Sequence, residues 1–161
     1  MSVEKVAVSA CLLGENCKYN GGNNRDEKVI KYLEGKEYIT VCPECYGGLS
    51  TPRVPSEIEE GYDGADVVKG CIFSDCKKEG AHVYSREGVD VTSEFLKGAQ
   101  KALEEIRDFG AKKAILKESS PSCGVHKIYT GRFDGTKKEG SGVSAALFRN
   151  FGIELISEKD L

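Results

Sequence analysis

Short apolar runs alternate along the chain with segments of helical periodicity. Four of these runs have the length and β-branched content of buried strands: residues 3–10, 38–41, 111–117 and 153–156. Between the second and third runs, apolar side chains recur at helical spacing from Phe95 to Phe109, after a predicted N-cap at Thr92 and before a stop at Gly110. The alternation predicts an α/β fold with a mainly parallel, Rossmann-like sheet flanked by helices.

Two shorter helices and one irregular segment complete the predicted outline. Asn24 or Asp26 is placed to cap a helix that runs to about Leu33, and a second helix is expected over residues 143–150. Residues 58–91 are the least regular part, because glycines interrupt them throughout. We expect a hairpin or flap there, built from strand-like pieces at 66–72 and 82–85, and a glycine-punctuated loop over 124–135.

Length and composition indicate one soluble domain. The chain has 161 residues and a mass of 17.5 kDa, which fits a single domain spanning residues 1–161. Its apolar fraction of 39% and charged fraction of 30% are typical of globular proteins. No apolar run approaches the ~20 residues that a membrane helix needs, and the N-terminus lacks the pattern of a signal peptide. We therefore expect a cytoplasmic protein without a membrane partner.

The charge balance favours a small-molecule partner over nucleic acid. The formal net charge is −3 and the pI is near 5.6, which argues against a broad electrostatic footprint on nucleic acid. Basic residues nevertheless gather in the last third of the chain: Lys112, Lys113, Lys117, Lys127, Arg132, Lys137 and Lys138. A local basic patch therefore stays open as an expectation.

Seven cysteines are a high and odd number for a cytoplasmic chain, where disulfides are rare. Three of them lie among turn residues after a predicted strand: Cys11 and Cys42 follow theirs directly, and Cys123 comes at the end of a short turn-forming run after the third. If those strands are parallel neighbours, the three thiols meet at the carboxyl edge of the sheet, where open α/β sheets bind ligands. Three thiolates leave one metal position open, and soft sulfur ligands suit either zinc or an iron–sulfur cluster.

The remaining thiols carry weaker signals. Cys42 and Cys45 form a CxxC motif, which in a redox enzyme of the thioredoxin kind stands where a helix opens. Gly47 and Gly48 follow at once, so we do not expect that helix or that chemistry here. Three others, Cys17, Cys71 and Cys76, are interpreted as incidental thiols, pocket lining or a second, minor metal site.

Several longer motifs, in order along nearly the whole chain, resemble those of one family. They are Ser9–Gly14 (SACLLG), Val41–Glu44 (VCPE), Pro52–Arg53, Pro55–Ile58 (PSEI), Leu116–Gly124 (LKESSPSCG) and Tyr129–Phe133 (YTGRF). On these motifs the chain is similar to the thiouracil desulfurase (TudS) family. It departs from the family pattern by the extra thiols at Cys17 and Cys45 and by a slightly longer 58–91 segment with Cys71 and Cys76.

The resemblance implies a 4Fe-4S cluster held by Cys11, Cys42 and Cys123, with the fourth iron free to take the sulfur of the substrate. It also implies an enzyme that removes sulfur from 2-thiouracil, or from thiouridine in related multidomain members, without net redox change. By motif position, the catalytic carboxylate and serine of the family fall on Glu44 and Ser120. The implied partner is a small thiolated pyrimidine, and thiouridine in tRNA stays open.

Each of these side chains also has a structural alternative. Glu44 either deprotonates the attacking water, with a pKa raised by burial beside a negative cluster, or is a carboxylate at a loop or helix start. Ser120 either binds a polar atom of the substrate or bonds the backbone amides of its own turn. Arg53 either anchors a uracil carbonyl or pairs with Glu57.

Two rival functions remain at this point. One is a sulfurtransferase that forms a persulfide on Cys45 or Cys17. The other is a non-catalytic module that binds an iron–sulfur cluster or zinc.

Overall fold

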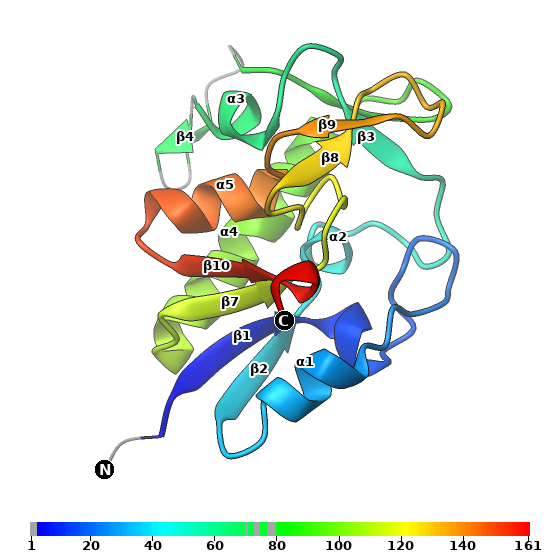
Figure 1. The fold of residues 1–161 in the computed structure, drawn as a ribbon. Helices are drawn as coiled ribbons and strands as arrows, with labels where there is room; N and C mark the ends of the chain where they lie inside the picture. Colours follow the sequence, from blue (N-terminus) through cyan, green and yellow to red (C-terminus); the bar gives the residue numbers. More distant parts are fainter. Residues whose placement is uncertain (1–2, 70, 73–74, 77–79) are drawn as a thin grey trace.

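The computed structural model describes residues 3–69, 71–72, 75–76 and 80–161. Its centre is a sheet in the order β10-β7-β1-β2, in which every pairing is parallel (Figure 1). The four strands are β1 (Lys5–Ser9), β2 (Glu37–Val41), β7 (Lys113–Leu116) and β10 (Glu154–Ser157). The predicted α/β class and the four predicted core strands are confirmed.

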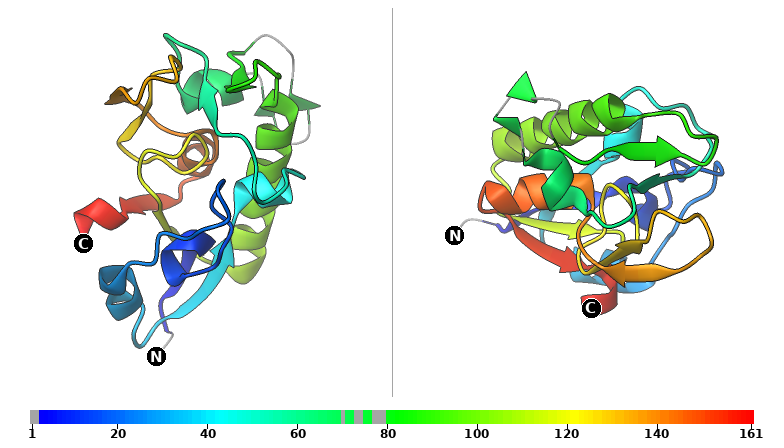
Figure 2. Two further views of the ribbon diagram at one scale, coloured as in Figure 1. Left: turned by 90° about the vertical axis from the view of Figure 1, so that its right-hand side faces the viewer. Right: turned by 90° about the horizontal axis from the view of Figure 1, so that it is seen from above.

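Helices cover both faces of this sheet. Since side chains alternate across a strand, Val6 and Val8 of β1 face one side, where they pack with Val29 of α1 (Glu27–Tyr32). Ala7 of β1 faces the other side and packs with residues of α4 (Thr92–Phe109) and α5 (Val143–Asn150), among them Phe95 and Phe148. The result is three layers, with the sheet between α1 and the α4–α5 pair (Figure 2).

The strand order brings three strand ends together. The chain passes from β1 to its neighbour β2, then crosses over to β7 on the other side of β1. Such a reversal in strand order opens a crevice at the carboxyl edge of an α/β sheet. The segments that follow β2, β1 and β7 therefore begin side by side, as the three predicted cysteine ligands require.

Two of the helix ends predicted from the sequence are confirmed, and one is wrong. Asp26 caps α1 by accepting hydrogen bonds from two backbone N–H groups, and Gly110 ends α4 with a left-handed φ of 88°. Thr92 is not an N-cap, because α4 already begins at that residue. Its hydroxyl oxygen instead accepts a hydrogen bond from Val83 N–H.

The irregular segment contains a helix that the sequence did not predict. The expected strand over 66–72 is wrong for its first part, because α3 (Gly64–Val68) starts behind a capping box formed by Asp63 and Asp66. The strand expected at 82–85 is present as β6 (Val83–Ser85), but its antiparallel partner is β3 (Ser56–Ile58) and not the expected piece at 66–72. A second short pair joins β4 (Cys71–Ile72) to β5 (Asp75–Cys76).

Further short elements lie close to the sheet edge. They are η1 (Ala10–Leu13), α2 (Pro43–Tyr46), β8 (Lys127–Tyr129), β9 (Lys137–Glu139) and η2 (Glu158–Asp160). The strand β8 interrupts the loop expected over 124–135 and pairs antiparallel with β9. Figure 1 shows that β3, β8 and β9 together form a cap above the carboxyl ends of the central strands.

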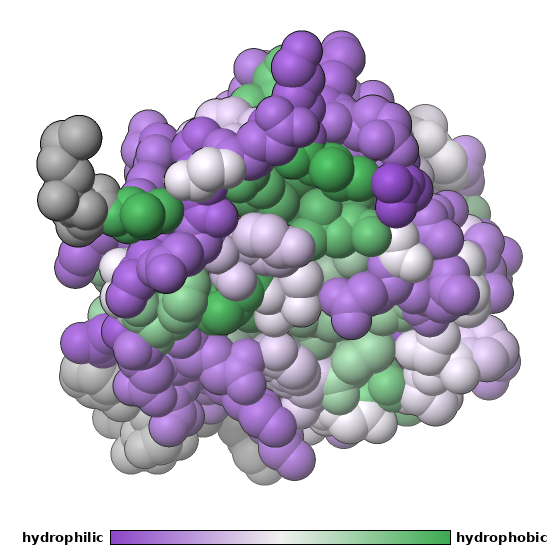
Figure 3. Space-filling model, turned by 90° about the horizontal axis from the view of Figure 1, so that it is seen from below, coloured by the Kyte–Doolittle hydropathy of each residue, from purple (hydrophilic) through white to green (hydrophobic). Residues whose placement is uncertain are grey.

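Among the described residues, no helix is both long and apolar enough to cross a membrane. The face seen from below is mainly hydrophilic, with apolar areas between the hydrophilic residues (Figure 3).

Candidate functional site

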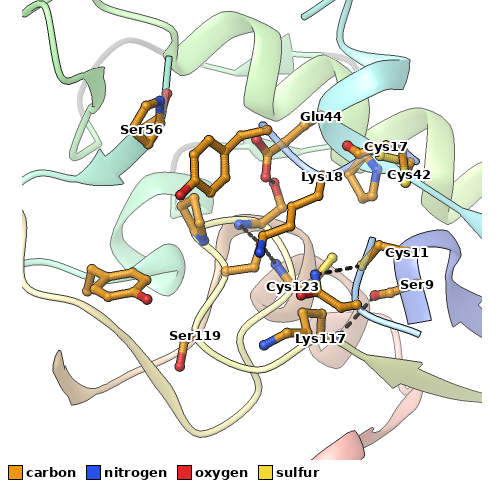
Figure 4. A pocket seen from close by; sticks show the side chains of 18 of the residues that line it. Ser9, Cys11, Cys17, Lys18, Cys42, Glu44, Ser56, Lys117, Ser119 and Cys123 are labelled. Atoms are coloured by element: carbon orange, nitrogen blue, oxygen red, sulfur yellow. Dashed lines mark hydrogen bonds between the residues drawn. The ribbon is translucent and has the colours of Figure 1, made fainter. Parts of the chain in front are cut away.

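A cavity of about 430 Å³ lies between the carboxyl edge of the sheet and the cap. Its walls include the predicted ligands Cys11, Cys42 and Cys123 and the predicted catalytic residues Glu44 and Ser120. Figure 4 shows Cys11, Cys42 and Cys123 around the same hollow, although they come from three different segments. The structure thus brings all five predicted site residues together.

Cys11 stands in the 3-10 turn that follows β1. Its carbonyl oxygen accepts hydrogen bonds from the backbone N–H groups of Gly14 and Asn24, at 3.2 and 2.9 Å, which closes the loop onto the turn. The side-chain amide of Asn24 also donates to the Cys11 sulfur at 3.4 Å. Burial raises the pKa of the Cys11 thiol, and the Asn24 hydrogen bond opposes that effect only in part.

Cys42 follows β2 and precedes the single turn of α2. This turn lies against the backbone of α4, because a Cβ placed on Gly98 would come within 1.8 Å of the Pro43 carbonyl oxygen. The Cys42 thiol donates a long hydrogen bond of 4.0 Å to the Cys17 carbonyl oxygen. Contact with Cys17 and then burial raise the pKa of Cys42.

Cys123 is the most buried of the three ligands, with 5% of its surface exposed. Ser120 Oγ accepts hydrogen bonds from the N–H groups of Ser122 and Cys123, both at 3.1 Å. The first N–H groups of α5 support the same turn, since Val143 and Ser144 donate to the carbonyl oxygens of Pro121 and Ser122 at 2.8 Å. Burial raises the pKa of Cys123, and the nearby Cys11 and Cys42 add to that rise.

The donor set fits an iron–sulfur cluster. Cys123 is buried and both Cys11 and Cys42 are half-buried, and this burial raises the pKa of each of the three thiols. They become thiolates together only if a strongly positive group binds them. In the described part of the chain, no three Cys, His, Asp or Glu side chains converge closely enough to hold one metal ion. A cluster does not need such convergence, because its cysteines bind different iron atoms.

Glu44 projects into the cavity from α2 and is fixed at both carboxylate oxygens. Arg53 Nε donates to Oε1 at 3.1 Å, and the Ser122 hydroxyl donates to Oε2 at 3.3 Å. The side chains of Arg53 and Glu44 are only 8% and 16% exposed, so the ion pair is shielded from water. Arg53 Nη2 also donates to the Cys17 carbonyl oxygen at 3.0 Å, which ties the Cys17 loop to the same ion pair.

The structure can be compared with the structural roles that the sequence left open for Arg53 and Ser120. The expected pairing of Arg53 with Glu57 is wrong, since Arg53 pairs with Glu44 and Glu57 accepts backbone hydrogen bonds from Gly131 and Phe133. Ser120 does bond the backbone amides of its own turn. The hydroxyl proton of Ser120 is not used by those two bonds, because in both of them the oxygen is the acceptor.

Sequence reasoning missed Glu118, which organises the turn of Cys123. It is 7% exposed, and its Oε1 accepts hydrogen bonds from the N–H groups of Ser119, Val125, His126 and Lys127. Burial alone would raise the pKa of Glu118, but these backbone donors outweigh it and lower the pKa. A charged residue directly after a buried strand, inside a long motif, was the signal available in the sequence.

The other thiols were not predicted as ligands of the cluster. Cys17 lines the cavity beside Cys42, whereas Cys45 is not among the lining residues and lies 3.5 Å from Thr51 Oγ1. The expectation that no helix opens at the CxxC motif is wrong, although α2 has only four residues. The predictions for Cys71 and Cys76 concern side chains that lie outside the described part of the structure, and only the backbone pairing of these two residues is described.

Comparison with known proteins gives three matches. The family model of 2-thiouracil desulfurase matches residues 6–160. The uncharacterized protein YbbK of Bacillus subtilis is 43% identical over 156 residues, which is 97% of each chain. A solved structure of the [4Fe-4S]-dependent thiouracil desulfidase TudS is 40% identical and superimposes with a TM-score of 0.79, over 98% of this chain and 93% of that one.

Proposed function

The chain belongs to the 2-thiouracil desulfurase family, and from that premise we propose that it removes sulfur from a thiolated pyrimidine such as 2-thiouracil with the help of a 4Fe-4S cluster. The observation that carries the proposal is the meeting of Cys11, Cys42 and Cys123 in one cavity beside Glu44. We take residues 1–161 as a single domain of this kind, acting in the cytoplasm, where thiols stay reduced.

Cys11, Cys42 and Cys123 would hold the cluster as thiolates. When bound, the cluster supplies a thiophilic Lewis acid that draws negative charge from the sulfur as it leaves. Burial of Cys123 keeps bulk water from that side, and the Asn24 amide satisfies one lone pair of the Cys11 sulfur.

Glu44 is the proposed general base. It takes a proton from the water that attacks the carbon bearing sulfur, and the overall change is thiocarbonyl plus water to carbonyl plus hydrogen sulfide. Arg53 holds Oε1, so Oε2 is the oxygen directed toward Ser122 and the turn of Cys123. The buried ion pair thus orients the base before the substrate arrives.

Ser120 is the proposed partner of a polar atom on the pyrimidine. Its oxygen already accepts two backbone hydrogen bonds, which fix the position of the hydroxyl group. The hydroxyl proton remains to be donated to a carbonyl oxygen or ring nitrogen of a substrate in the cavity.

An anaerobic reconstitution followed by a sulfide-release assay tests the proposal. The loaded protein should be brown, with about four irons and four sulfides per chain, and should convert 2-thiouracil into uracil and sulfide. Cys123→Ala should lose both cluster and activity, whereas the matched control Cys45→Ala should keep both, because Cys45 does not line the cavity. A colourless protein with one zinc, or a full cluster with no sulfide released, would contradict it.

The same variants separate the rival functions. Complete loss of sulfide release in Cys45→Ala or Cys17→Ala with an intact cluster would show that this thiol takes part in the reaction, which the proposal does not include. Turnover of a thiolated tRNA and not of free 2-thiouracil would move the substrate class from small molecule to RNA.

A further inference from the structure

Among the basic side chains of the cavity, one half-buried lysine has no ion-pair partner in the described part of the chain. Five basic residues line the cavity: Lys18, Arg53, Arg86, Lys117 and Lys137. Arg53 pairs with Glu44, and Lys117 pairs with Glu158 at 3.3 Å. Two of the others are exposed, so their charges are solvated. Lys18 alone combines partial burial with a free ammonium group.

The backbone of Lys18 is held in place. Its N–H donates to the Gly22 carbonyl oxygen at 3.1 Å, and its own carbonyl oxygen accepts from Gly21 at 2.8 Å. Both neighbours of Lys18 are bound to Arg53. The carbonyl oxygen of Cys17 accepts a hydrogen bond from the Arg53 side chain, and the carbonyl oxygen of Tyr19 accepts one from the Arg53 backbone N–H at 2.6 Å. Figure 4 shows the side chain of Lys18 extending into the cavity, on the side of Cys123.

The contacts of the ammonium group within the protein are weak. It lies 5.9 Å from the ring centroid of Tyr19, close to the ~6 Å limit of a useful cation–π contact. The carboxylates that line the cavity are already occupied, since Glu44 binds Arg53 and both Glu57 and Glu118 accept backbone N–H groups. A half-buried cation without a partner is unfavourable, which points to a ligand that supplies negative charge.

We propose that Lys18 binds the pyrimidine in its deprotonated form and so selects substrates whose ring carries a negative charge; this inference rests on the proposed function. Thiolated pyrimidines lose an N–H proton readily, because the charge spreads over nitrogen, oxygen and sulfur. The cluster thiolates and Glu44 repel such an anion, and Lys18 is the cation placed to offset that repulsion.

Binding of two sulfur-free pyrimidines to the cluster-loaded protein tests the assignment. Barbiturate is an anion at neutral pH and uracil is neutral, and both are titrated by calorimetry and as competitive inhibitors. Wild type should bind barbiturate more tightly than uracil. Lys18→Met should weaken barbiturate binding roughly 10-fold or more, which is the usual effect of losing a hydrogen bond to a charged group, and change uracil binding far less.

Two further variants serve as controls. Lys18→Arg should keep most of the preference for the anion, and Lys137→Met should behave as wild type, because Lys137 lines the same cavity but is exposed. In kinetics with 2-thiouracil, Lys18→Met should raise KM much more than it lowers kcat. Iron and sulfide content of each variant should equal that of wild type.

The outcomes separate this inference from the proposed function. Equal weakening of both ligands in Lys18→Met, unchanged binding, or no binding of barbiturate to wild type would overturn the role of Lys18. A wild-type protein that shows the charge preference but releases no sulfide from 2-thiouracil would instead overturn the proposed reaction.

Discussion

At the scale of single residues, Glu44 is held by one partner that is nine residues away and one that is 78 residues away in the chain. Arg53 and Ser122 bind its two oxygens, and Ser122 is the residue before the proposed ligand Cys123. The proposed base and the proposed cofactor site therefore share one hydrogen-bond network. This connection explains why a carboxylate stands two residues after a cysteine in the VCPE motif.

Replacement of Glu44 by glutamine should remove catalysis and leave the cofactor in place. Glutamine keeps the shape and can still accept from Arg53, but it cannot take a proton from water, so kcat should fall by about 100-fold or more. Ser122→Ala is the matched control, because it removes only one hydrogen bond to Glu44 and should cost less than about 10-fold. The assay is sulfide release, with iron content measured in parallel; loss of iron in Glu44→Gln would contradict a purely catalytic role.

Glu118 should make stability depend on acidic pH. Its folded-state pKa is lowered, so its contribution is present above the unfolded pKa of about 4.3 and is lost as pH falls through the folded value. Glu118→Gln should therefore reduce the free energy of unfolding by about 2 kcal/mol at neutral pH, and the difference from wild type should shrink below about pH 4.

Urea unfolding between pH 3 and pH 7 measures this difference. Glu34→Gln is the control, because Glu34 is exposed and should show no such pH dependence. A constant gap between wild type and Glu118→Gln across the whole range would show that the charge of Glu118 does not support the turn.

At the scale of elements, the position of Cys42 depends on the close packing of α2 against α4. Gly98 of α4 and Gly47 after α2 let the two backbones touch, since a Cβ on Gly47 would lie 2.0 Å from the Glu94 carbonyl oxygen. This contact sets the distance of the Cys42 turn from the rest of the site. A sequence pattern does not reveal it, because a glycine inside a long helix looks only like a weak helix former.

Gly98→Ala should therefore destabilise the protein, although alanine favours helix by about 1 kcal/mol over glycine. The new methyl group would lie against the Pro43 carbonyl oxygen and push α2 outward, so we expect a net loss of about 2 kcal/mol and less iron bound per chain. Lys97→Ala on the same helix is the control, since Lys97 is exposed. Thermal unfolding and iron content check both; a rise in Tm for Gly98→Ala would show that α2 adapts freely.

The strands and helices that a local pattern of apolar residues marks were predicted well. The elements that were missed depend on contacts that only the folded chain makes. The strands after which Cys11, Cys42 and Cys123 stand, and the long helix over 92–109, are marked by apolar periodicity. The helix α3 was missed because its start rests on the reciprocal capping of Asp63 and Asp66, which a glycine-rich context concealed.

At the scale of the whole molecule, the order of the sheet is what assembles the site. The alternation of strands and helices predicted parallel neighbours, and so a common edge for three thiols. It did not predict how the site is supported, because the support comes from tertiary contacts. Arg53 pairs with Glu44, and Glu118 accepts hydrogen bonds from the backbone amides of a later segment. The meeting of the three thiols could be inferred from strand position, whereas the residues that position them required the folded structure.

A cofactor bound at three neighbouring strand ends should stabilise the whole fold. Cys11, Cys42 and Cys123 follow β1, β2 and β7, so one bound group links the central strands and the cap above them. A group that binds the folded chain and not the unfolded one adds to the free energy of unfolding. Removal of the cluster by an iron chelator should therefore lower Tm by roughly 10 °C, which corresponds to about 3 kcal/mol for a chain of this size.

Anaerobic calorimetry of loaded and chelated protein measures this shift. Cys11→Ala, which cannot complete the ligand set, should unfold near the Tm of the chelated wild type and should not respond to the chelator. The control Cys45→Ala should show the full difference, since Cys45 stands outside the cavity. Equal Tm values for loaded and chelated wild type would mean that the three strand ends keep their arrangement without the cofactor, and that Glu118, Gly98 and Asn24 alone preform the site.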